Sequence, residues 1–103
     1  MWNVPSNKIL DSTPRLYENE DKKLADICIH MHFFIGGCDW YIAEYDGDDL
    51  FWGFANLNDP QNSEWGYVSF RELKSLKVRG IEIDFDLHWQ PVPAKEVPLI
   101  KCY

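Results

Sequence analysis

The chain has 103 residues, 16% of them aromatic, and a formal net charge of −7 at neutral pH. This length fits one domain, so we expect residues 1–103 to form a single domain. The acidic excess argues against direct nucleic-acid binding, which needs a basic face. We also expect no membrane insertion, because no apolar run approaches the ~18 residues that span a bilayer.

The first predicted element is a short helix over residues 7–12. Ser6 is a typical N-cap residue, and Pro14 stops the helix. Residues 18–23 follow as a turn that carries charges of both signs, and such a run is expected to be solvated.

The centre of the chain predicts three consecutive strands at residues 27–35, 39–46 and 50–57, because apolar side chains recur there with a period of two. Rings on both faces indicate that the sheet is covered on both sides. The first strand has a core face made of Ile29, Met31, Phe33 and Ile35. In the second strand one face carries Trp40, Ile42 and Glu44, and the other carries Tyr41, Ala43 and Tyr45.

Tight turns join these three strands. Gly36-Gly37 forms the first turn, and the Asp-Gly pair in Asp46–Asp49 is a strong hairpin signal because its turn needs positive φ. Loops this short require antiparallel neighbours. Within the strands, Gly53 and Gly66 either make room for a neighbouring ring or mark a bulge.

The second half of the chain predicts a fourth strand and a helix. The strand covers residues 64–68. Ser69 and Glu72 then form a capping box, which starts a helix that ends near Val78. The apolar positions that should face the sheet from this helix are Phe70, Leu73 and Leu76.

Residues 81–86 alternate apolar and acidic side chains and predict a fifth, half-exposed strand. Pro91 and Pro93 end the sheet, because proline cannot donate to a ladder. The predicted fold class is therefore α+β: a mainly antiparallel meander sheet of about five strands, a helix at about 69–78 packed on one face, and a short N-terminal helix. An unpaired fifth strand would favour a homodimer through edge pairing.

Several motifs, in this order along the chain, resemble those of one bacterial family. The motifs are H-F-F at 32–34, W-Y-I-A-E-Y-D-G at 40–47, L-F-W-G-F at 50–54, E-W-G-Y-V-S-F-R-E-L at 64–73 and D-L-H-W-Q-P at 86–91. Over residues 10–93 the chain is similar to the family catalogued as domain of unknown function twenty-nine fifty-eight, whose members are small proteins of bacterial chromosomes, plasmids and phages. Val68 and Phe70-Arg71 depart from the family pattern. The resemblance implies an accessory protein of mobile elements, and it assigns no catalytic residue because the family has no settled activity.

Sulfur and imidazole groups raise the question of a metal site. Cys28, His30, His32 and Cys38 are donor types that zinc prefers, but they lack the paired spacing of zinc motifs. We therefore expect packed or surface histidines, with no metal and no cofactor. Three cysteines, an odd number, and no secretory signal predict reduced thiols and a cytoplasmic location.

Acidic side chains gather at two places. Glu82, Asp84 and Asp86 share one face of the fifth strand, where they form either its solvated side or an acidic docking surface. Glu44 and Asp46 lie at the hairpin but lack the twelve-residue spacing of a calcium loop, so turn chemistry and solvation explain them better.

Aromatic and imidazole side chains suggest a possible pocket. Trp89, beside His88, is interpreted as a ring that covers the core. The alternative is a pocket in which His32 or Glu44 acts as a general base. That pocket would be lined by His32, Tyr45, Arg71 and Trp89.

Two functional hypotheses follow. The first is a non-enzymatic protein-interaction module that binds an unidentified protein partner through an acidic and aromatic surface. The second is a small ligand-binding or hydrolytic domain with a pocket of His, Glu and Tyr side chains. The candidate residues for the pocket or interaction surface are His32, Trp40, Glu44, Tyr45, Asp46, Arg71, Glu82, Asp84, Asp86, His88 and Trp89.

Overall fold

The structure, a computed structural model, describes residues 5–57, 61, 63–75, 77–78, 81–98 and 100. The predicted core residue Leu76 and the side chain of Glu82 lie outside the described part. Within that part, no helix has the length and apolar character needed to cross a membrane.

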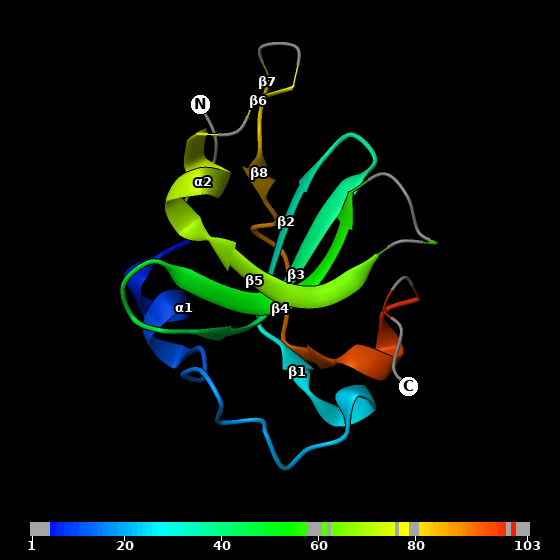
Figure 1. The fold of residues 1–103 in the computed structure, drawn as a ribbon. Coiled ribbons are helices and arrows are strands. Elements are labelled where there is room, and N and C mark those ends of the chain that lie inside the picture. Colours follow the sequence, from blue (N-terminus) through cyan, green and yellow to red (C-terminus); the bar gives the residue numbers. More distant parts are fainter. Residues whose placement is uncertain are drawn as a thin grey trace.

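The main sheet has five antiparallel strands in the order β5-β4-β3-β2-β8 (Figure 1). The strands are β2 (Met31–Ile35), β3 (Cys38–Tyr45), β4 (Leu50–Leu57), β5 (Glu64–Ser69) and β8 (Asp84–Phe85). The α-helices α1 (Asn7–Ser12) and α2 (Phe70–Ser75) complete an α+β fold, as the sequence predicts.

Within the described residues, two small sheets and the 3₁₀ turns η1 (Leu24–Asp26) and η3 (Ala94–Glu96) flank the main sheet. β1 (Cys28–Ile29) pairs with β9 (Val92–Pro93), and β6 (Lys77–Val78) pairs with β7 (Ile81–Glu82).

Three predicted elements are shorter than expected. The strand predicted at 27–35 is interrupted at His30, because the segment before it, β1, pairs with β9 instead of joining the main sheet. The helix predicted to reach Val78 ends at Ser75, because β6 pairs with β7. The same pairing divides the strand predicted at 81–86, since only β8 joins the main sheet.

Both faces of the sheet are covered. The first core lies under α1 and α2 and contains Met31, Phe33, Phe51, Phe70 and Leu73, among others. The second core lies on the opposite face, under η1, β1, β9 and η3 (Figure 1). It includes Ile27, Ile29, Tyr41, Phe54 and Ala94. The predicted core face of the first strand is buried throughout, although Ile29 belongs to the second core.

A β-bulge in β3 sets which side chains face which core. The register with β4 shifts between Ile42 and Glu44, so the alternation expected along β3 fails after Ala43. Tyr45 therefore enters the first core together with Ile42, whereas Glu44 turns to the second face and lies opposite Trp52 of β4.

Candidate functional site

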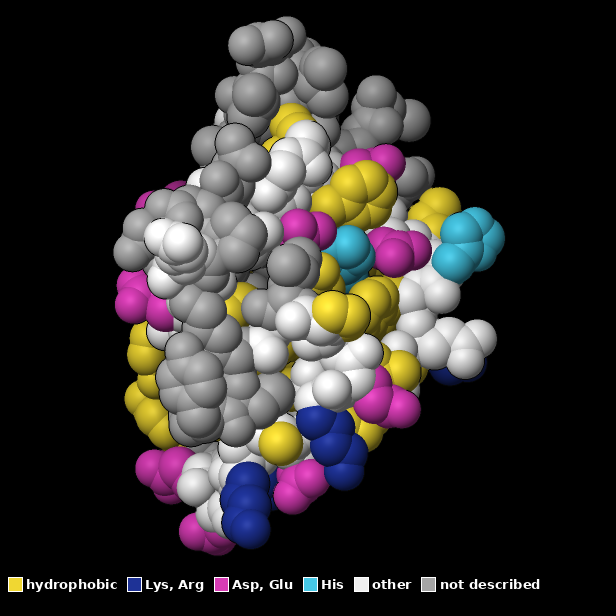
Figure 2. All heavy atoms as spheres, turned by 90° about the vertical axis from the view of Figure 1, so that its right-hand side faces the viewer, with side chains coloured by type: hydrophobic (Ala, Val, Ile, Leu, Met, Phe, Trp, Pro, Cys, Tyr) yellow, Lys and Arg dark blue, Asp and Glu magenta, His cyan; other side chains and the backbone are white. Residues whose placement is uncertain are grey.

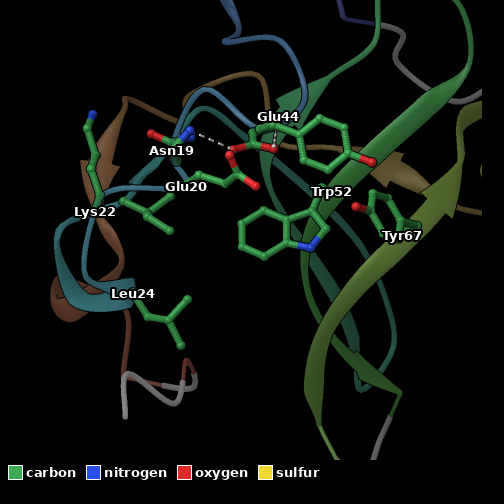
Figure 3. Close-up of a pocket in the computed structure, with 9 residues that line it drawn as sticks. Asn19, Glu20, Lys22, Leu24, Glu44, Trp52 and Tyr67 are labelled. Carbon is green, nitrogen blue, oxygen red and sulfur yellow. Dashed lines mark hydrogen bonds between the residues drawn. The ribbon is translucent and has the colours of Figure 1, made fainter.

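A pocket of about 260 Å³ lies on the second face of the sheet, between segment 17–24 and strands β3, β4 and β5 (Figure 3). Apolar side chains of Leu24 and Ile27 form part of its wall. The polar and aromatic residues that line it are Tyr17, Asn19, Glu20, Lys22, Glu44, Trp52 and Tyr67.

Glu44 is the buried carboxylate of this pocket, and the residue is only 4% exposed. Its Oε1 accepts the Tyr17 N–H at 2.9 Å, and its Oε2 accepts the Asn19 N–H at 3.1 Å. Throughout the described part of the chain, no Lys, Arg or His nitrogen lies within 4 Å of it. Lys22 extends its ammonium group away from this carboxylate (Figure 3). Glu44 is thus held by backbone donors and has no ion-pair partner among the described residues.

Aromatic side chains from β4 and β5 form the opposite wall. Trp52 is the cross-strand partner of Tyr67 and stacks on Trp65, with ring centroids 4.8 Å apart. A hydrogen bond with Tyr17 raises the pKa of Tyr67, and the negative charges of Glu44 and Glu20 act in the same direction. The Tyr67 phenol therefore lies in the field of the two carboxylates that line the pocket.

Segment 17–24 is fixed to the pocket at its first residue. Tyr17 has a φ of 70°, a left-handed conformation that costs a non-glycine residue about 1–2 kcal/mol. Its N–H to Glu44 and its contact with Tyr67 offset this cost. The conformation of the segment thus depends on the residues that line the pocket.

Asn19 is a second buried polar residue beside Glu44, at 5% exposure. Its backbone N–H is used by Glu44, but its side-chain Nδ2 has no hydrogen-bond partner in the described structure. A buried donor without a partner is unfavourable, so Asn19 is a polar residue held in this wall at a cost to stability.

The predicted site residue His32 lies in a different cluster on the same face. Its Nε2 is 2.8 Å from Asp39 Oδ1, and its Nδ1 is 3.4 Å from Asp86 Oδ2. The imidazole stacks on Tyr41 at 4.6 Å and lies 5.2 Å from the Trp89 ring. Figure 2 shows histidine side chains among hydrophobic and acidic ones on this side of the molecule.

The structure does not bring His32, Tyr45, Arg71 and Trp89 into one pocket. Because of the bulge, Tyr45 packs in the first core, across the sheet from His32 and Trp89. Arg71 is exposed on α2, within 4 Å of Asp48 and Asp49.

Trp40 and Trp89 both pack against the hydrophobic cores. Trp40 is 6% exposed and belongs to the first core, so it does not contribute an exposed ring to a docking surface. Trp89 packs against the second core, and its Nε1 donates to the Ile29 carbonyl at 3.0 Å. This contact confirms the interpretation of Trp89 as a cover over the core. His88 is exposed on the preceding turn.

The acidic side chains that were predicted to share one face of the fifth strand are not free carboxylates where the structure describes them. Asp86 pairs with His32 and also accepts the His88 N–H, and Asp84 accepts the Phe85 N–H. Asp46 is a turn residue, as expected: its Oδ1 accepts the N–H groups of residues 48, 49 and 50 at 2.8–3.0 Å.

No group of three or more His, Cys, Asp or Glu side chains that could hold a metal ion occurs among the described residues. The donors weighed above as zinc ligands, Cys28, His30, His32 and Cys38, therefore do not form such a group there. Cys28 and Cys38 are free thiols, and burial raises the pKa of Cys28.

Of the predicted residues only Glu44 lines the pocket described above. Sequence reasoning missed Tyr17, Asn19, Trp52 and Tyr67, although Trp52 and Tyr67 occur within predicted strands. Comparison of the chain with protein-family models, curated proteins and solved structures found no match. The resemblance to a bacterial family therefore stays a prediction.

Proposed function

We propose that this chain is a non-enzymatic protein-interaction module, and that its pocket receives a cationic side chain from a basic segment of a partner protein. One observation carries the proposal. The Glu44 carboxylate is buried beneath aromatic rings, and the described part of the chain supplies no cation to it.

The chemistry of the pocket suits a cation. A buried charge is costly unless it is paired, so a positive group from a partner would gain from meeting Glu44. Aromatic faces such as those of Trp52 and Tyr67 also attract cations. The net charge of −7 would steer a basic partner toward the protein.

The size of the pocket supports one side chain as its occupant. Its volume of about 260 Å³ is below the range of about 300–1,000 Å³ that is usual for drug-sized ligands. A partner segment would therefore insert one residue here and lay its remaining residues over the exposed charged segment beside the pocket, residues 18–23. A cytoplasmic location, in which free thiols such as Cys28 persist, is part of this proposal.

The alternative, a hydrolytic domain with a His, Glu and Tyr pocket, has less support. Glu44 lines the pocket, but His32 is engaged by two aspartates and Tyr45 lies in the first core. A general base needs to reach its substrate together with the other catalytic groups. The observed positions favour binding over catalysis.

The test is a binding titration with a peptide that contains both Lys and Arg, beside an acidic peptide of equal length. We expect the basic peptide to bind and the acidic peptide not to bind. The affinity for the basic peptide should fall as salt is added. Glu44→Gln should weaken binding by about tenfold, the effect of losing one charge-assisted contact. Glu72→Gln removes the same charge from the exposed side of α2 and should leave binding unchanged. Failure of the basic peptide to bind would refute the proposal, as would equal affinities of the two variants.

A further inference from the structure

We infer that the cationic group received by the pocket is the guanidinium of an arginine rather than a lysine ammonium. This inference rests on the proposed function, and it comes from how Glu44 is already bonded. The backbone N–H of Tyr17 bonds Oε1, and the backbone N–H of Asn19 bonds Oε2.

Each oxygen of the Glu44 carboxylate therefore accepts one hydrogen bond from the protein. A carboxylate has about four lone-pair sites, two on each oxygen, so one site on each oxygen is left for a ligand. Two parallel acceptors are the complement of the forked N–H groups of arginine, which bind carboxylates bidentately. An ammonium is a point donor and makes no comparable use of both oxygens.

The walls favour the same ligand. Guanidinium is planar and stacks on aromatic faces, and it is more weakly hydrated than an ammonium, so its burial costs less. Trp52 and Tyr67 supply the rings on one side, and Tyr67 is 54% exposed at the rim, where a partner can reach it. Leu24 and Ile27 supply apolar surface for the methylene stem of the side chain.

The experiment uses the wild-type protein and three peptides that differ at one position, which is arginine, lysine or citrulline. Citrulline keeps the planar shape of arginine but lacks its charge. We expect the arginine peptide to bind about tenfold more tightly than either of the others, measured by titration calorimetry at fixed salt.

The outcomes separate this inference from the proposed function. Equal binding of the arginine and lysine peptides would overturn the choice of guanidinium and leave the basic-partner proposal intact. If the citrulline peptide bound as tightly as the arginine peptide, charge would not be recognised. Both the inference and the proposed function would then be overturned. If none of the three peptides binds, the proposed function itself fails.

The aromatic wall of the pocket can be tested with a variant that leaves the buried Glu44 unchanged. Tyr67→Ala removes an exposed ring at the rim, and we expect it to weaken binding of the arginine peptide by about threefold or more. Leu57→Ala is the matched control, because Leu57 is 62% exposed on the adjacent strand and does not line the pocket. Equal effects of the two substitutions would place the ligand elsewhere and overturn the inference.

Discussion

Gly53 lies at a point of the main sheet that has no room for a side chain. A Cβ built there would overlap the Tyr41 carbonyl oxygen and lie 2.9 Å from the Ile42 Cα. Both obstacles are backbone atoms next to the bulge in β3, so they cannot move without shifting the strand. Gly66 is its partner on β5, and a Cβ at that position would meet nothing within 4 Å.

We predict that Gly53→Ala lowers the free energy of unfolding by about 1–3 kcal/mol, the usual cost of overpacking. Gly66→Ala is the matched control, because it adds the same methyl group to the paired strand without a clash. Urea denaturation of both variants measures the difference. A Gly53→Ala variant as stable as Gly66→Ala would mean that the bulge adapts freely.

For single residues, the sequence predicts the kind of structural feature better than its position in the fold. It predicts that Gly53 makes room for a neighbouring ring or marks a bulge, whereas the obstacles there are backbone atoms of β3 and the bulge lies in that strand, where it redirects Glu44. It also treats residues 18–23 as solvated, because charge is their dominant feature, and so overlooks the buried Asn19. Burial there depends on Glu44, which is 25 positions away in the chain.

The hairpin between β3 and β4 depends on one carboxylate. Backbone N–H groups, first that of Asp48 and then those of Leu50 and Asp49, hold the pKa of Asp46 below its ordinary value of 3.8. Its ionised form therefore stabilises the folded state. That contribution is fully present above the unfolded pKa and is lost as the pH falls through the lower, folded value.

We predict that Asp46→Asn destabilises the protein most near neutral pH, because asparagine is a weaker acceptor for three N–H groups. The difference in stability from wild type should narrow as the pH falls below about 3.8. Denaturation curves recorded from pH 7 to pH 3 provide the measurement. A difference that stays constant over this range would show that the charge of Asp46 has no role.

Element boundaries follow from the sequence where the signals are local. The Ser6 cap fixes the start of α1, and the Asp46 turn fixes the start of β4. Strand pairing decides the others. α2 stops early because β6 pairs with β7, which follows it closely in the chain, and the first strand is interrupted because its start, β1, pairs with the distant β9. Neither partner is visible from the local pattern of apolar residues.

At the scale of the molecule, the main sheet separates two cores that share its central strands. Phe33 lies in the first core and Phe54 in the second, and each is at most 1% exposed. A defect in either core weakens the strands between them, so the two should not unfold separately.

We therefore predict a single cooperative unfolding transition, in keeping with one domain. Phe33→Leu and Phe54→Leu should each lower the free energy of unfolding by about 1–2 kcal/mol, because each leaves a small cavity. The transition then moves to a lower denaturant concentration. Tryptophan fluorescence and far-ultraviolet circular dichroism should report coincident curves for both variants. Separate transitions for the two probes would mean that the cores are independent units.

The central strand β3 has six consecutive buried residues, Trp40 to Tyr45, because neither of its faces meets solvent. We expect deuterium to reach most of these amides only when the whole domain opens. Their exchange rates in plain buffer would then give the global stability directly, with no denaturant added.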